Sequence, residues 1–182
     1  MAHVTPDRLE AGLRHVEESP SEQGTVELVV RRPEENEREV LDEAQLDTAV
    51  GLVGDMWHRR PSRKGPDGGP NPLAQLTIMN ARLAALVAGE KARWPIAGDQ
   101  LYVDFDLSVD NLPAGSRLAV GAAVFEITDD PHTGCAKFSA RFGSDALRFI
   151  NAPAGRALRL RGANTVVVEP GTVRPGDAVR KL

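Results

Sequence analysis

Apolar and polar residues alternate over several short stretches of the chain, and this alternation predicts β-strands. Side chains of a strand point to opposite faces of a sheet in turn, so a half-buried strand shows a period of two. Residues 101–105 have this pattern, and Thr25 to Arg31 carries the β-branched valines that favour strands. Further strands are predicted at Val40-Leu41, Leu76 to Met79, Arg117 to Gly121, Ala122 to Thr128, Thr165 to Val168 and Ala178 to Leu182.

Helical periodicity is confined to three stretches. Thr5-Pro6-Asp7 is a typical helix start, with a hydroxyl at the N-cap and proline at the first helical position. Apolar residues follow at helical spacing until Ser19-Pro20 ends the segment. Asn80 is predicted to cap a second helix that ends near Gly89, and a third helix is predicted over residues 144–150.

Short strands separated by turn signals, about every 8–12 residues, are typical of an all-β barrel or sandwich. A parallel α/β sheet would instead need long strands and long helices in alternation. We therefore expect a mainly β protein, a closed or partly open β-barrel with a few short peripheral helices. The 182 residues are expected to form a single domain in which residues 1–24 are an N-terminal helical extension.

The composition is that of a folded, soluble protein. Hydrophobic residues make up 41% and charged residues 26% of the chain, which excludes a disordered chain. The net charge of −4 gives no general attraction to nucleic acid or to an anionic membrane, so neither is an expected partner. No apolar run approaches the roughly 20 residues that span a bilayer, and the N-terminus shows no signal-peptide pattern. A single cysteine fits a reducing compartment, so we expect a cytoplasmic protein.

Cys135, the only cysteine, follows a loop that contains proline and glycine. A thiolate is both a nucleophile and a metal ligand, and nearby cations lower the pKa of a thiol. His132, Lys137 and Arg141 lie within six residues of the cysteine in sequence. We expect Cys135 to be catalytic, with His132 as its proton donor or base. The alternative is that Cys135 is a small buried hydrophobe and that His132 stabilises the loop.

Gly-Asp pairs recur at three points, Gly54-Asp55, Gly98-Asp99 and Gly176-Asp177. Glycine permits a positive φ and aspartate can hydrogen-bond its own turn, so the pairs are predicted to be barrel corners. Asp55 and Asp99 have a second interpretation as pocket residues. The chain lacks a dinucleotide-binding glycine fingerprint, a phosphate-binding loop, a paired-cysteine zinc pattern and a Ser-His-Asp set with supporting spacing. The charged stretch from Arg32 to Glu39 is predicted to be a solvated loop.

Six motifs follow one another along roughly residues 25–182. They are Gly51 to Asp55, Gln75 to Ile78, Gly98 to Leu101, Leu118 to Gly121, Cys135 and Glu169 to Val179. In this order they resemble the MOSC domain, a module similar to the C-terminal domain of molybdenum cofactor sulfurases. The chain departs from the commoner pattern at two places. Thr133-Gly134 precedes the cysteine where arginine and proline are usual, and Gln100 stands where asparagine is frequent.

The resemblance implies a β-barrel with a pocket near Cys135 that binds the molybdenum cofactor (molybdopterin). In some relatives the matching cysteine is a molybdenum ligand in enzymes that reduce N-hydroxylated compounds. By this resemblance, Cys135 is both the metal ligand and a catalytic residue, and the protein supports oxotransfer or the reduction of N-hydroxylated small molecules. Such a reduction would require a separate electron-donor protein, because no cysteines remain for an iron–sulfur cluster and no flavin signature is present.

The chemistry of this cofactor indicates which residues would bind it. The dithiolene of molybdopterin leaves molybdenum in need of another soft ligand, and a thiolate suits it. The phosphate of the pterin side chain needs cations, hydroxyls or backbone N–H groups. Asp55 belongs to a family motif, His58 and Arg59 follow it, and Lys137 and Arg141 flank the cysteine. We expect these five residues to bind the cofactor.

Two other functions stay open. One is a sulfur-carrier or sulfur-transfer module that forms a persulfide on Cys135, with a sulfur donor as partner and no tightly held metal. The other is a non-catalytic barrel that binds a small ligand or a partner protein, with Cys135 in a structural role. If the protein is an enzyme, the cofactor-binding function makes it a molybdenum-dependent oxidoreductase and the sulfur-transfer function makes it a sulfurtransferase.

Overall fold

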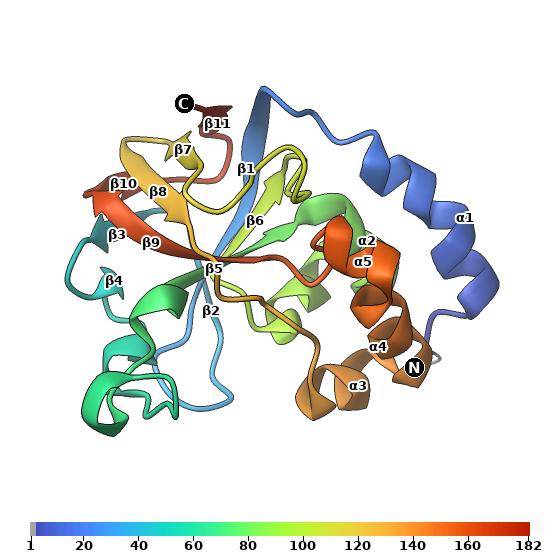
Figure 1. Ribbon diagram of the computed structural model, residues 1–182, viewed down its shortest axis with the longest axis horizontal. Helices are drawn as coiled ribbons and strands as arrows, with labels where there is room; N and C mark the ends of the chain where they lie inside the picture. The colour runs from blue at the N-terminus through green and yellow to red at the C-terminus, as the bar shows by residue number, and fades with distance from the viewer. Residues whose placement is uncertain (1–2) are drawn as a thin grey trace.

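The protein, seen here as a computed structural model that describes residues 3–182, is built around a closed barrel of seven strands (Figure 1). The barrel strands are β1 (Gln23–Arg31), β5 (Leu76–Asn80), β6 (Leu101–Asp104), β7 (Arg117–Val120), β8 (Ala123–Ile127), β9 (Ala163–Glu169) and β11 (Ala178–Lys181). They pair in the order β11-β7-β8-β9-β5-β6-β1, and β1 pairs again with β11. The predicted mainly β barrel is therefore confirmed.

Four short strands lie outside this ring. They are β2 (Glu39–Leu41), β3 (Ala44–Asp47), β4 (Gly51–Leu52) and β10 (Gly171–Val173). β2 pairs with the end of β1, while β10, β3 and β4 form a separate three-stranded sheet. The sequence analysis predicted β2 but assigned no strand to β3, β4 or β10, because two to four residues give too little alternation to detect.

One strand pair in the barrel is parallel. β5 pairs with β6 in parallel, with Ile78 opposite Leu101, whereas the other barrel pairs are antiparallel. A parallel pair needs a crossover connection, and here α2 (Ala81–Ala88) and η4 (Lys91–Ala97) provide it. The expected absence of an extended parallel sheet holds, but the chain still contains one crossover unit.

The alternation of strand residues separates two apolar clusters. Val29 and Val103 belong to the cluster inside the barrel, whereas Val30 and Tyr102, their chain neighbours, belong to a second cluster outside it. The second cluster also contains residues of the helices, such as Leu83 of α2. Because β1, β5 and β6 carry apolar residues on both faces, the helices have a buried face to pack on.

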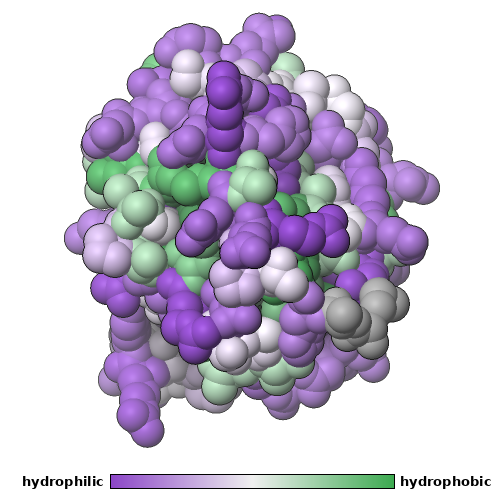
Figure 2. Space-filling model, turned by 90° about the vertical axis from the view of Figure 1, so that its right-hand side faces the viewer, coloured by the Kyte–Doolittle hydropathy of each residue, from purple (hydrophilic) through white to green (hydrophobic). Residues whose placement is uncertain are grey.

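The α-helices cover one side of the barrel (Figure 1). Besides α2, they are α1 (Pro6–Glu17), α3 (Ala136–Phe142), α4 (Ser144–Asn151) and α5 (Pro153–Ala157). Their outer surface is mainly hydrophilic, with a band of hydrophobic residues across it (Figure 2). The first, second and fourth helices were predicted, whereas α3 and α5 were not. Within residues 3–182, no helix has the length and apolar character needed to cross a membrane.

Three 3-10 helices lie in the long connection between β4 and β5: η1 (Met56–Arg59), η2 (Pro66–Gly68) and η3 (Pro72–Ala74). The glycine- and proline-rich composition of this stretch predicts a loop, and single turns are what it can form. Asp55 accepts a hydrogen bond from the Trp57 N–H at 3.0 Å and so caps η1. This connection forms one wall of the cavity described next.

Candidate functional site

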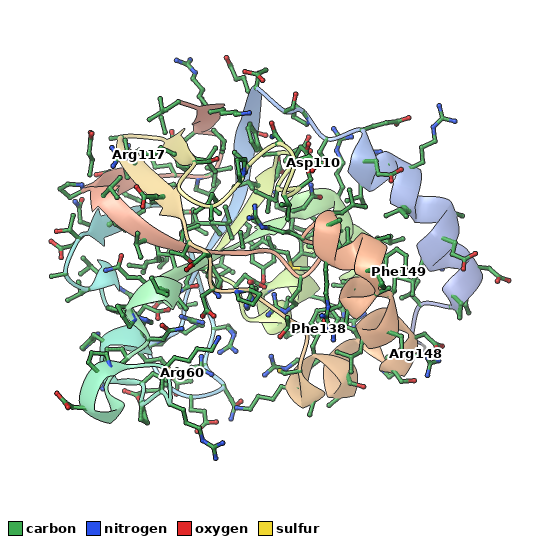
Figure 3. All side chains as sticks on the ribbon, viewed as in Figure 1. Arg60, Asp110, Arg117, Phe138, Arg148 and Phe149 are labelled. Carbon is green, nitrogen blue, oxygen red and sulfur yellow. The ribbon has the colours of Figure 1, made fainter. Side chains whose placement is uncertain are left out.

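A cavity of about 630 Å³ lies at one end of the barrel, between the η1–η3 connection and α3. Arg60, after η1, and Phe138, on α3, lie on opposite sides of it (Figure 3). Thr77 of β5 and Asn164 of β9, which pair across neighbouring strands, also line the cavity. Its walls therefore come from segments that are far apart in sequence and meet only in the closed barrel.

The cavity wall is strongly basic although the whole chain carries a net charge of −4. Seven lysine or arginine residues line it, against two acidic residues, Glu35 and Asp130. Three of the cations, Arg38, Arg60 and Arg141, have no carboxylate partner among residues 3–182. An anionic ligand is the complement of such a wall. The seven are Arg32, Arg38, Arg60, Lys64, Lys137, Arg141 and Arg161.

Arg38 and Arg141 converge on Gly98. Arg38 donates to the Pro95 carbonyl at 3.2 Å, and Arg141 donates to the Ile96 carbonyl at 2.8 Å. A Cβ atom added to Gly98 would lie 3.6 Å from a terminal nitrogen of each guanidinium group. Burial lowers the pKa of Arg38, and the nearby positive charge of Arg141 lowers it further. Two like charges held this close would be stabilised by an anion between them.

Cys135 is exposed at the edge of the cavity and forms the N-cap of α3. Its side chain makes no capping hydrogen bond in this conformation. Partial burial would raise the pKa of the thiol, but the backbone N–H groups of Phe138 and Lys137 and the charges of Arg161 and Arg141 together lower it below its ordinary value. The alternative of a small buried hydrophobe is therefore wrong, because the side chain is open to solvent.

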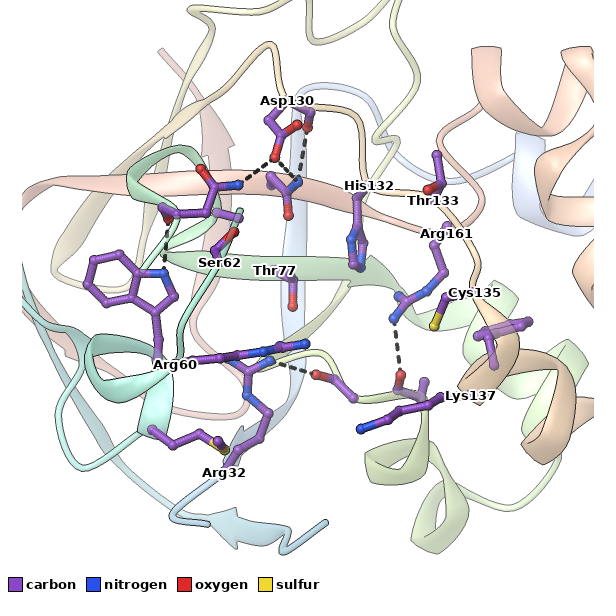
Figure 4. Close-up of a pocket in the computed structure, with 18 of the residues that line it drawn as sticks. Arg32, Arg60, Ser62, Thr77, Asp130, His132, Thr133, Cys135, Lys137 and Arg161 are labelled. Carbon is purple, nitrogen blue, oxygen red and sulfur yellow. Dashed lines mark hydrogen bonds between the residues drawn. The ribbon is translucent and has the colours of Figure 1, made fainter. Parts of the chain in front are cut away.

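His132 and Arg161 lie beside the cysteine (Figure 4), and Asp99 links them through its carboxylate. Asp99 is fully buried; its Oδ1 lies 3.1 Å from His132 Nε2, and its Oδ2 accepts a hydrogen bond from Arg161 at 2.6 Å. Burial would raise the pKa of Asp99, but Arg161 and His132 hold it well below its usual range. Asp99 therefore stays ionised and fixes both of its neighbours, which is more than a turn residue does.

Burial lowers the pKa of His132, and the charge of Arg161 lowers it further, while the bond to Asp99 only partly offsets these effects. The imidazole is therefore neutral at neutral pH. Asp99 is ionised and can only accept, so we assign the ring proton to Nε2. Nδ1 then carries a lone pair and can take up a proton.

Two buried polar atoms of the cavity wall have no hydrogen-bond partner in the described part of the chain. They are Arg161 Nε and Asn164 Oδ1, on residues that are 7% and 5% exposed. Gly162, between them, has a φ of +101°, and a Cβ there would lie 2.2 Å from the Ile78 carbonyl oxygen. The backbone is thus pressed against β5. Unsatisfied buried groups are costly, so a donor and an acceptor are available here for a ligand or for water.

The structure brings four of the predicted site residues together at the cavity. Cys135, His132 and Lys137 line it (Figure 4), and so does Arg141. Lys137 forms an ion pair with Glu35 at 2.9 Å, so its charge is partly neutralised. Arg141 faces Gly98, has no carboxylate partner in the described part of the chain, and contributes its full charge.

The other three predicted residues do not line this cavity. Asp55 is fully buried and accepts two side-chain hydrogen bonds from Arg32, at 3.0 and 2.9 Å. His58 Nδ1 lies 3.0 Å from the Asp55 carbonyl oxygen, and Arg59 donates to the Pro33 carbonyl and to a side-chain oxygen of Glu34. These residues support the wall from behind: Asp55 holds Arg32, which does line the cavity.

Sequence reasoning missed the contribution of the charged stretch after β1. It predicted a solvated loop over residues 32–39, but Arg32 is only 8% exposed and Arg38 also faces the cavity. The correction has a physical basis, because Arg32 is paired with buried Asp55 and donates to the Gly98 carbonyl at 3.1 Å. Pro33, directly after Arg32, was the one local signal of a restricted backbone conformation.

Comparison with known proteins gives the family. Residues 73–180, more than half of the chain, match the MOSC domain. No curated protein matches the sequence. The fold is similar to that of the YUAD protein from Bacillus subtilis (TM-score 0.64, 19% identity, 86% of this chain and 94% of that one). It is also similar to YiiM from Escherichia coli (TM-score 0.54, 19% identity, 87% and 69%) and to a hypothetical protein of known structure (TM-score 0.58, 20% identity, 87% and 69%). The motif order, the seven-stranded barrel and the sequence match agree: the chain belongs to the MOSC domain family.

Proposed function

We propose that the protein binds the molybdenum cofactor in the basic cavity, with Cys135 as a protein ligand of the metal, and that it supports oxotransfer or the reduction of N-hydroxylated compounds. One observation carries this proposal. An exposed thiol of lowered pKa lies at the edge of a cavity in which three arginines have no carboxylate partner among the residues that the structure describes. The MOSC family is associated with this cofactor, which supports the same assignment.

The residues present fit such a cofactor. A volume of about 630 Å³ lies within the range of small-molecule sites. Arg38 and Arg141 converge where a phosphate would be held by charge-assisted hydrogen bonds. Arg161 Nε and Asn164 Oδ1, which have no partner within residues 3–182, are a donor and an acceptor buried in the same wall. Cys135 offers a soft thiolate, the ligand type that suits molybdenum.

When bound, the cofactor supplies two-electron oxygen-atom transfer. Reduction of an N-hydroxyl group uses two electrons and two protons and yields an N–H group and water. His132 can hold one of these protons at Nδ1, since its Nε2 is engaged by Asp99. The electrons would come from a separate electron-donor protein.

Replacing Cys135 with serine tests the role of the sulfur. Serine is a preferred N-cap residue, so the Cys135→Ser variant should keep a free energy of unfolding within about 1 kcal/mol of the wild type. Its hydroxyl is hard and far less acidic, so the variant should lose bound molybdenum. Metal analysis of both proteins from a cofactor-competent host measures this, with wild-type protein from a cofactor-deficient host as the control. A serine variant that retains full molybdenum would remove Cys135 from the site.

A sulfur-carrier function is the second candidate, and the exposure of the Cys135 thiol favours it. A persulfide forms when the accessible Cys135 thiolate attacks the outer sulfur of a donor persulfide and the donor thiolate leaves, so no oxidant is needed. Mass spectrometry of the native protein separates the two candidates. A mass increase of one sulfur atom on Cys135 without metal supports the carrier, whereas stoichiometric molybdenum supports the cofactor site. Finding neither would leave a non-catalytic barrel.

A further inference from the structure

We propose that Asn151, the last residue of α4, is a positioning residue that holds Cys135 at the N-cap of α3, with its sulfur at the cavity edge. The contact is made through Gly134, the residue before the cysteine. Asn151 Oδ1 accepts a hydrogen bond from the Gly134 N–H at 3.0 Å, and Asn151 Nδ2 donates to the Gly134 carbonyl at 3.2 Å. One side chain thus fixes both polar groups of the residue that leads into Cys135.

Gly134 is held by close packing as well as by hydrogen bonds. A Cβ atom there would lie 2.7 Å from the Cδ1 atoms of both Ile150 and Leu147, on α4. Contacts this short do not occur in real structures, so another residue could be accommodated only if the α4 side chains moved. The backbone before Cys135 therefore lies flat against α4.

The segment is anchored at its other end too. The Asp130 side chain accepts hydrogen bonds from Lys64 and Asn71, and its carbonyl accepts one from Asn164 at 3.0 Å. His132 is held by Asp99. Asn151 supplies the last anchor before the helix. Without the Asn151 side chain, the last hydrogen-bonded residue before the cysteine would be His132, three residues away.

The start of α3 decides where the sulfur lies. Phe138 of α3 is 2% exposed, its ring lies 4.8 Å from that of Phe142, and the Arg161 guanidinium lies 5.3 Å from the Phe138 ring centroid. The body of α3 is thus fixed by packing. The position of the sulfur then depends on the backbone conformation of Gly134 and Cys135, directly before the helix. The importance of this entry for metal binding rests on the proposed function, but the geometry itself does not.

Three variants separate positioning from general stabilisation. Asn151→Ala removes both hydrogen bonds, and Asn151→Asp keeps the acceptor for the Gly134 N–H. Asn111→Ala is the control: Asn111 is also half-buried, donates to the carbonyls of Ser21 at 3.1 Å and Asp106 at 2.8 Å, accepts from the exposed Lys181 at 3.2 Å, and does not line the cavity. We expect the two alanine variants to melt at similarly reduced temperatures.

The readouts do not require the cofactor. Amide exchange at Gly134 should become about tenfold faster in Asn151→Ala, as expected for the loss of one hydrogen bond, and should be largely restored in Asn151→Asp. A fluorine label on Cys135, the only cysteine, should show a shifted or split ¹⁹F resonance in Asn151→Ala but not in Asn111→Ala. Unchanged exchange and an unchanged resonance in Asn151→Ala would overturn the proposal.

Molybdenum content adds a separate result. Asn151→Ala should carry less metal than Asn111→Ala of equal stability, and equal losses in the two variants would overturn the positioning role in binding. If the wild type itself binds no molybdenum, the proposed function fails, but the exchange and fluorine measurements still decide whether Asn151 positions the cysteine.

Discussion

The acidity of Cys135 has a different origin from the one that its sequence neighbours indicated. His132, Lys137 and Arg141 were expected to lower the pKa of the thiol through their charges. In the structure, the lowering comes from backbone N–H groups of Phe138 and Lys137 and from the charges of Arg161 and Arg141. The Lys137 ammonium is paired with Glu35, and His132 is neutral.

A lowered thiol pKa predicts the pH dependence of alkylation. The thiolate is the reactive form, so the rate should rise with pH and reach half its maximum below about 8.5, the ordinary thiol value. Native protein and iodoacetamide, followed by mass spectrometry between pH 5 and pH 10 or so, give this midpoint. Urea-unfolded protein is the control and should show the ordinary value. A native midpoint at or above the unfolded one would contradict the prediction.

His132 predicts an acid-dependent loss of stability. Its pKa is lowered in the folded state, so the unfolded chain binds a proton more readily. By linkage, this group leaves stability unaffected well above its unfolded pKa of about 6.5 and reduces it as pH falls below that value. The His132→Gln variant should therefore show a smaller fall in the free energy of unfolding between pH 7 and pH 5. Parallel pH profiles for the two proteins would show that His132 does not titrate in this way.

At the residue scale, the sequence identified four side chains that the structure places at one cavity, but not all of their partners. Cys135, His132, Lys137 and Arg141 were identified because they lie in one stretch of chain. Arg38 could not be identified, because its role depends on the position of η4, which presents the Pro95 carbonyl to it. Contacts between distant segments leave no local pattern in a single sequence.

Among the elements, α3 shows why short helices are hard to predict. It has seven residues and only two buried ones, Phe138 and Phe142, so its periodicity covers a single interval. Isolated helices of this length are unstable in water, and their stability comes from packing. The strands of the barrel were predicted because each contains a run of apolar or β-branched residues, alternating with polar ones in some of them. The short helix α3 is stabilised by its packing against α4.

The neighbouring helices α3 and α4 offer a matched pair of arginines. Arg141 of α3 faces the cavity, whereas Arg148 of α4 is 74% exposed and lies on the outer surface (Figure 3). Arg141→Gln should weaken the binding of inorganic phosphate about tenfold, because it removes a charge-assisted donor. Arg148→Gln should leave binding unchanged. Phosphate titrations at low salt measure both affinities, and equal affinities for the two variants would place the anion elsewhere.

For the whole molecule, β11 closes the barrel. It pairs with β7 and β1, with Val179 opposite both Val120 and Gly24. The sequence predicted this closure, because unpaired strand edges expose backbone groups. The parallel β5–β6 pair was not foreseen, since strand order depends on contacts across the barrel.

Removal of residues 177–182 should therefore destabilise the entire barrel. The truncation deletes β11 together with the Asp177 carbonyl, which accepts the Val26 N–H at 2.9 Å. Thermal unfolding followed by circular dichroism should show loss of the cooperative transition, or a midpoint at least about 10 °C lower. Removal of residues 3–5, which precede α1, is the control and should have a much smaller effect. A truncated protein with an unchanged midpoint would show that β11 does not hold the barrel closed.

Barrel closure also fixes the order of events when the protein folds. The first barrel strand pairs with the last, and the cavity joins Arg32 to Asn164, so the chain must complete its long-range contacts before the arginines converge. Long-range pairing of this kind makes folding slow. An anion that binds only the finished cavity finds no site in the folding transition state, so it cannot accelerate folding. Its effect is on the reverse step: it slows unfolding and lengthens the lifetime of the native protein.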